Sequence, residues 1–254
     1  MKESLQYLNN KQEQALMVLK SHIQGIQETT TQKPRNVISI SITHAPIHDE
    51  EITEENVIEV LFGVNNNSIL GYGCRDLTSI NIEGPYGSLN LLEWIQKFRP
   101  GIVISVQPPN SISCRGSSFY YRPEENPQED SQIQYREEIH LAIPEHRIPE
   151  DPITFFAHLL HEFGHALQDR LEINKPLNDP TNPLTAEERE MVMRSEENAT
   201  DFAIRVAKEL EVLLGIDELS QNLKDILREK LENYRKRLFR NSIDEKNNED
   251  NDGR

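Results

Sequence analysis

Cysteine is nearly absent from this sequence, which holds only Cys74 and Cys114 among its 254 residues. Two thiols are too few for a disulfide framework and lie too far apart in the chain for a paired metal motif. Long apolar runs are also missing, since none approaches the roughly 20 residues of a membrane span. The first residues, MKESLQYLNNKQEQ, contain no apolar segment of a secretory signal. These absences favour a cytoplasmic protein without a membrane partner.

Positive charge is scarce as well, because 27 Lys and Arg residues stand against 43 Asp and Glu residues and leave a net charge of -16. A protein that binds nucleic acid normally carries a basic surface, so this balance argues against a nucleic-acid partner. Acidity mostly serves solubility, although it also suits mimicry of DNA toward a DNA-binding enzyme. The length allows one large domain or two small ones, with a sizeable core.

Hydrophobic periodicity divides the chain into a mixed first region and a second region dominated by helices. Helices are predicted at 1–29, 53–63, 89–98, 151–171, 186–214 and 218–239, and strands at 37–43, 101–107 and 137–144. We therefore expect an α+β fold. Residues 1–115 form a mixed α/β region of unknown role, 116–240 form a second domain, and 241–254 form a disordered acidic tail.

One short motif in the second region carries chemistry. His161, Glu162 and His165 form the pattern H-E-x-x-H on the helix predicted at 151–171. Residues four apart lie on one face of a helix, so both imidazoles can reach one ion. Zinc is commonly bound by His nitrogens, and a catalytic zinc site keeps one position open for water. Glu162 lies about 100° around the helix from His161, so its carboxylate is placed to act as a general base on that water.

Two alternatives stay open around this motif. The pattern can occur by chance on an ordinary helix surface, but the helix is mostly apolar, and His side chains buried there need polar partners. His158 lies one turn before His161 on the same side of the helix. It can bind substrate or a second metal, although the spacing favours a hydrogen-bonded neighbour without a catalytic role.

A third ligand is expected from the helix predicted at 186–214. At 100° per residue, Glu196 lies about 60° from the centre of the apolar stripe of this helix, and Glu197 lies about 160° from it. A carboxylate beside a buried face needs a partner, and a metal is one, so Glu196 is the predicted ligand with Glu197 as the alternative. Ala199 and Ala203 are small and allow the two helices to approach closely.

HEFGH followed by EENATDFA resembles the gluzincin metallopeptidases, whose third zinc ligand is a downstream Glu. The spacing of Glu196, Ala199, Phe202 and Ala203 is similar to that of the ImmA/IrrE branch. Members of that branch are cytoplasmic peptidases of bacteria and mobile elements, and several of them cut transcriptional repressors. The chain departs from the pattern at Thr200, where the branch has Asp or Asn.

The stretch from SSFYY to the motif is also similar to the ArdC-type antirestriction zincins, in which a Tyr-rich strand and an edge strand precede the motif helix. The resemblance covers about residues 117–206. It implies a zincin-like domain over 116–240, in which a small sheet with an edge strand packs on the H-E-x-x-H helix and a glutamate helix. The strand at 138–144 is then the expected edge strand, with which a peptide can pair.

The sequence therefore predicts a zinc metallopeptidase of the gluzincin type that hydrolyses a peptide or protein substrate. Glu162 is the predicted general base, and His161, His165 and Glu196 are the predicted ligands of Zn²⁺. The alternative is a non-catalytic regulatory or antirestriction protein with a zincin fold, but the intact Glu162 favours the enzyme. A structural zinc site is disfavoured, because such sites are usually closed by four ligands rich in Cys. The residue that stabilises the transition state stays open among Tyr120, Tyr121, Tyr135, His140, His146 and Tyr234.

Overall fold

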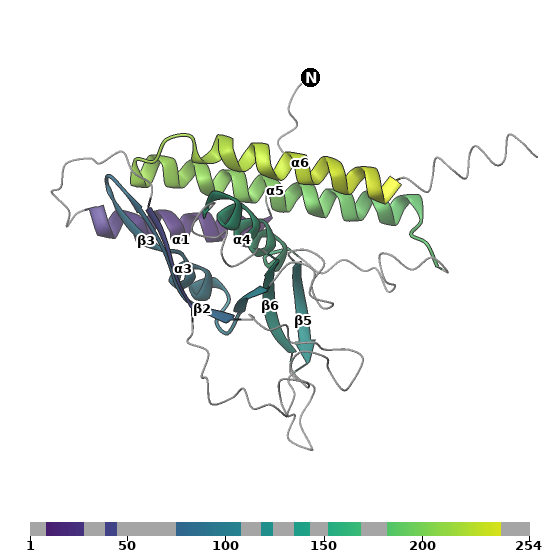
Figure 1. Ribbon diagram of the computed structural model, residues 1–254, viewed down its shortest axis with the longest axis horizontal. Helices are drawn as coiled ribbons and strands as arrows, with labels where there is room; N and C mark the ends of the chain where they lie inside the picture. The colour runs from purple at the N-terminus through teal and green to yellow at the C-terminus, as the bar shows by residue number, and fades with distance from the viewer. Residues whose placement is uncertain are drawn as a thin grey trace, which may run out of the picture.

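The computed structural model describes residues 9–27, 39–44, 75–107, 118–123, 135–142, 152–168 and 182–239. Within these ranges the chain has a mixed α+β fold (Figure 1). Its helices are α1 (Asn10–Gln27), α3 (Leu91–Phe98), α4 (Pro152–Ala166), α5 (Ala186–Leu214) and α6 (Leu219–Phe239). Its strands are β1 (Ser39–His44), β2 (Arg75–Gly84), β3 (Gly87–Asn90), β4 (Val103–Gln107), β5 (Ser118–Pro123) and β6 (Tyr135–Ala142). None of the described helices is both long and apolar enough to cross a membrane.

Most predicted elements within the described ranges are present. The helices α1, α3, α4, α5 and α6 and the strands β1, β4 and β6 each overlap a predicted element. Nothing in the sequence pattern predicted β2 and β3, whose hairpin turns at Pro85 and Tyr86 rather than at the Asn-Gly or Asp-Gly that marks such turns. The helix predicted at 53–63 and the acidic tail at 241–254 lie outside the described residues.

The strands form one sheet in the order β1-β2-β4-β6-β5, and β3 pairs with β2 beside this path. The β4–β6 pair is parallel and the other pairs are antiparallel. The expectation that the strand at 138–144 lies at the sheet edge is wrong, because β6 has β4 on one side and β5 on the other. Periodicity identifies a strand but not its neighbours, and here β5 takes the edge position instead.

The sheet and the core both continue across residue 115, where the sequence predicted a boundary between two regions. Strand β2 pairs with β4, and β4 pairs with β6 from the second region. The buried side chain of Trp94 on α3 donates a hydrogen bond to the Ala15 carbonyl oxygen of α1 and meets the ring of Phe163 on α4 edge to face at 5.4 Å. Phe163 in turn packs on Phe202 of α5. The division at residue 115 stays a prediction, but the packing joins α1 to the motif helix.

Helix α5 is held at both of its ends. Thr185 and Glu188 form a capping box at its start, and Gly215 ends it in the left-handed conformation with φ 68°. The backbone N–H of Tyr86 in the β2–β3 hairpin donates to the Leu214 carbonyl oxygen in the last turn. Helices α5 and α6 lie side by side, with α4 below them in Figure 1. The long helix that carries Glu196 is therefore a fixed support for the site.

Candidate metal centre

Helices α4 and α5 approach closely at one point. Ala199 and Ala203 are fully buried, as the sequence predicted for a close helix contact. The opposing residue is Gly164, which lies inside the H-E-x-x-H motif. A Cβ atom at this position would lie 3.0 Å from both the Cα and the carbonyl oxygen of Ala199. Gly164 occupies one of the two unspecified positions of the motif, and its missing side chain lets the two helices meet.

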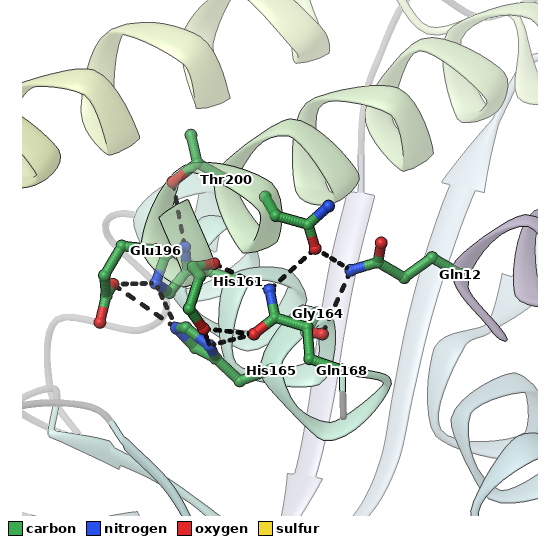
Figure 2. A network of polar contacts seen from close by, with 9 residues as sticks. Gln12, His161, Gly164, His165, Gln168, Glu196 and Thr200 are labelled. Atoms are coloured by element: carbon green, nitrogen blue, oxygen red, sulfur yellow. Dashed lines mark hydrogen bonds and ion pairs between the residues drawn. The ribbon is translucent and has the colours of Figure 1, made fainter. Parts of the chain in front are cut away.

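This contact brings together the three predicted ligands (Figure 2). Nε2 of His161 lies 3.1 Å from Oε2 of Glu196 and 3.2 Å from Nε2 of His165. Nε2 of His165 lies 3.5 Å from the same carboxylate oxygen. Among the described residues, these three form the group of His, Cys, Asp or Glu side chains that could hold a metal ion.

The three side chains are partly accessible rather than sealed in the core. The exposed fractions are 12% for His161, 18% for His165 and 23% for Glu196. The group is therefore in contact with solvent. Glu162, next to His161 on α4, is more deeply buried at 5%.

The far nitrogen of each imidazole has its own oxygen partner. Nδ1 of His161 lies 3.2 Å from the hydroxyl oxygen of Thr200, and Nδ1 of His165 lies 3.1 Å from Oε1 of Gln168. An amide oxygen only accepts, so His165 donates from Nδ1, which leaves Nε2 as the nitrogen that would bind a metal. Such contacts commonly orient the His ligands of metal sites. Thr200 thus makes the contact to His161 from the position at which the chain departs from the ImmA/IrrE pattern.

Gln168 was not singled out in the sequence, and Thr200 was noted only as a departure from the ImmA/IrrE pattern, although helical spacing could have found the contacts of both. Thr200 follows Glu196 by one turn of α5 and therefore shares its face. Gln168 follows His165 at the point where α4 ends, after Ala166 rather than near 171 as predicted. The N–H of Gln168 donates to the His165 carbonyl oxygen, an i to i+3 bond that tightens this last turn. The tightened turn brings the Gln168 side chain beside the ring of His165.

The carboxylate and the imidazoles shift each other's protonation strongly. Burial lowers the pKa of His165, but the hydrogen bond and charge of Glu196, together with the charge of Glu162, outweigh it and raise the pKa to about 9. Burial raises the pKa of Glu196, but the hydrogen bonds and charges of His161 and His165 outweigh it and hold the pKa well below its usual range. Without a metal, the cluster therefore holds a proton that a cation would displace.

Helix α6 contributes two further groups to the electrostatics of the site. Burial and the charge of Glu196 raise the pKa of the Tyr234 phenol to about 12. Desolvation lowers the pKa of Lys230, one turn earlier, while the charges of Glu162 and Glu196 oppose that shift. Tyr234 was one of several candidates for transition-state stabilisation, and Lys230 was not considered. The sequence could not place α6 beside the motif, because the pattern of a helix does not name its neighbour.

The other residues considered for metal binding, substrate binding or transition-state stabilisation lie away from the cluster or outside the described residues. Glu197 contacts Arg235 of α6 and so faces away from the two imidazoles. His158 is partly buried on α4 and does not belong to the three-residue cluster. His140 is buried within β6, where its Nε2 lies 2.8 Å from Oε2 of Glu138. His146 and the side chains of Tyr120, Tyr121 and Tyr135 lie outside what the structure describes.

Comparison with known proteins gives no relative for this chain. No protein-family model matches it, and no match was found among curated proteins or among solved structures.

Proposed function

We propose that the chain is a zinc-dependent metallopeptidase of the gluzincin type, with a zincin-like arrangement of sheet, motif helix and glutamate helix. The spacing of the ligand atoms is the observation that supports it most. Zinc bonds of about 2.0–2.1 Å at tetrahedral angles place ligand atoms about 3.3 Å apart. The three separations among His161, His165 and Glu196 are 3.1, 3.2 and 3.5 Å. Two His and one carboxylate leave a fourth position open, as in catalytic sites.

Zinc held by His161, His165 and Glu196 would polarise the scissile carbonyl and lower the pKa of a water molecule. Glu162 accepts a proton from the attacking water and passes it to the leaving amine. Its burial beside His161 keeps bulk solvent away from that transfer. The Tyr234 phenol is protonated at neutral pH, as any tyrosine is, and the charge of Glu196 acts on it. It is proposed to donate a hydrogen bond to the carbonyl oxygen as charge develops there.

The substrate chain is proposed to pair with β5. Among the described residues, β5 pairs with β6 on one side and with no strand on the other. The unpaired N–H and C=O groups of an edge strand are a template for an extended peptide. Strand β5 also lies against α4, so a peptide added to its open edge runs beside the motif helix. The edge-strand role expected of residues 138–144 thus moves to residues 118–123.

Metal content and peptide hydrolysis test the proposal together. Zinc is measured by mass spectrometry on the purified protein and on Glu196→Ala, with Glu197→Ala as the matched control on the neighbouring position. We expect about one zinc per chain in the wild type and in the control, and its loss in Glu196→Ala, because three protein ligands hold a catalytic zinc. The absence of zinc from the wild type, after reconstitution as well, would exclude the metal centre.

Glu162→Gln separates catalysis from binding. The amide keeps the size of the side chain but cannot accept the proton, so we expect full zinc content and no turnover of a peptide library. Hydrolysis by this variant at the wild-type rate would contradict the role of Glu162. Zinc binding by the wild type without any hydrolysis would instead favour the non-catalytic regulatory protein.

A further inference from the structure

A buried side chain from α1 reaches the metal centre through a chain of amides. Gln12 is fully buried, and its Nε2 donates to Oδ1 of Asn198 at 2.7 Å and to the Gly164 carbonyl oxygen at 3.4 Å. Gln168 donates from its own Nε2 to the same Asn198 oxygen at 2.8 Å. Figure 2 shows this line of contacts running from Gln12 to His165. The first helix of the structure is thereby joined to both helices that carry ligands.

The orientation of Gln12 is fixed by the backbone of its own helix. Asn9 and Gln12 form a capping box, in which Asn9 Oδ1 accepts the N–H of Gln12 and Gln12 Oε1 accepts the N–H of Asn9. Since the amide oxygen of Gln12 is occupied in this way, its NH₂ group must face α4 and α5. Asn9 also donates from Nδ2 to the Leu167 carbonyl oxygen. The start of α1 therefore supplies donors to the Gly164 carbonyl in the last turn of α4 and to the Leu167 carbonyl just after it.

The orientation then passes from one amide to the next. Asn198 Oδ1 accepts from Gln12 and from Gln168, so the NH₂ group of Gln168 faces Asn198. The same NH₂ group donates to the Ser195 carbonyl oxygen at 2.8 Å, which an amide oxygen could not do. Oε1 of Gln168 must therefore face His165, where it accepts from Nδ1. The Ser195 hydroxyl donates to this oxygen as well. The donor and acceptor ends of Gln12, Asn198 and Gln168 are thus all assigned by their partners.

We propose that Gln12 is a positioning residue for the metal centre, which acts through Asn198 and Gln168 to keep Nε2 of His165 turned toward the metal. This inference rests on the proposed zinc site. It assigns a role to the N-terminal region, for which no role could be predicted from the sequence. Removal of a partner that orients a metal-bound His typically weakens metal binding about 10- to 100-fold. Because Gln12 acts through two intermediate amides, we expect the lower end of that range.

The test compares two substitutions at neighbouring positions of α1. Gln12→Met keeps the length of the side chain and removes its donors. Glu13→Ala is the control, because exposed Glu13 forms an ion pair with Arg205 of α5 at 2.9 Å and so ties α1 to α5 without touching the amide line. Zinc affinity is measured by competition with a chelator, and the visible absorption of the Co²⁺-loaded protein reports the ligand geometry. Circular dichroism shows that each variant is folded.

The inference predicts an about tenfold weaker zinc affinity and an altered Co²⁺ spectrum for Gln12→Met, with both unchanged for Glu13→Ala. Gln12→Glu provides a second variant that keeps the oxygen of the capping box and loses the NH₂ group, and it serves if Gln12→Met does not fold. Wild-type affinity and spectrum in a folded Gln12 variant would overturn the inference and leave the metal site standing. A wild type that binds no zinc would remove the proposed function, and the positioning role with it.

Discussion

Replacing Gly164 by alanine tests whether close contact between α4 and α5 builds the metal centre. The added Cβ atom would lie 3.0 Å from the Cα and the carbonyl oxygen of Ala199, and 3.2 Å from its Cβ. Carbon atoms pack best at about 3.5–4.0 Å, so the helices must separate by about half an ångström. Two of the three atoms belong to the backbone, so no side-chain rotation relieves the contact.

The expected change in the free energy of unfolding follows from two opposing effects. Alanine gains about 1 kcal/mol of helix propensity over glycine. Overpacking of a well-packed contact costs about 1–3 kcal/mol. We expect a net loss of up to ~2 kcal/mol for the zinc-free protein, measured by urea denaturation.

Gly164→Ala should weaken zinc affinity more than it lowers the free energy of unfolding. The imidazoles belong to α4 and the carboxylate to α5, so the separation moves Glu196 away from His161 and His165. Functional groups must be held within about 0.5 Å of their working geometry, which is the size of the expected shift. We therefore expect at least a roughly tenfold loss of zinc affinity, measured by competition with a chelator.

Gly84→Ala is the matched control for this effect. Its Cβ atom would clash with the Leu214 carbonyl oxygen at the other end of α5, far along the helix from Glu196. This variant should lose stability but keep the zinc affinity of the folded protein. Equal zinc affinities for Gly164→Ala and the wild type would refute the idea that this contact sets the ligand spacing.

Two further predictions concern proton transfer and pH. Tyr234→Phe should lower kcat about 100-fold and change KM little, because its hydrogen bond strengthens in the transition state, and steady-state kinetics will show a proportional loss in both kcat and kcat/KM. In the zinc-free protein, the raised pKa of His165 stabilises the folded state. This stabilisation is fully present below pH 6.5 and is lost as the pH rises through about 9. The lowered pKa of Glu196 contributes stability that is present above 4.5 and is lost at lower pH. The free energies of unfolding of the wild type and of Glu196→Gln, measured by urea denaturation, should therefore differ most between pH 4.5 and 6.5. This difference should decline by at most ~3 kcal/mol toward pH 9 and above. A difference that does not vary with pH would contradict the pairing of His165 with Glu196.

The sequence predicted best what is decided within one helix. The predicted range 186–214 coincides with α5, because the capping box at Thr185 and the glycine at 215 mark both ends locally. Helical geometry also separated Glu196 from Glu197, since the angle from the apolar stripe tells which carboxylate faces the neighbouring helix. The structure places Glu196 beside the imidazoles and Glu197 beside Arg235.

Prediction failed where the answer depends on contacts between distant segments. The edge position expected of β6 from the family resemblance is wrong, and its own pattern could not correct this, because it contains nothing about β5 pairing outside it. Gly164 was passed over, because its role depends on what lies opposite, and that is Ala199 on another helix. The sequence pattern did not identify Gln12 as a residue near the site, since its partner Asn198 is 186 residues away in the chain. The hydrophobic pattern of a helix shows which face is buried, but it does not show which side chains of other helices contact that face.

The contact between Gln12 and Asn198 joins residues 186 positions apart, and this separation has a consequence for proteolysis. The three ligands all come from α4 and α5, yet the line of amides that orients one of them begins at the start of α1. A protease that cuts after α1 would leave the three proposed ligands, Glu162 and all the described strands in the remaining chain. The remaining chain would still lose the donor from Gln12 that fixes Asn198 and, through it, His165. If Gln12 positions His165 as proposed, cleavage after the N-terminal helix, far from the ligands in sequence, would weaken metal binding.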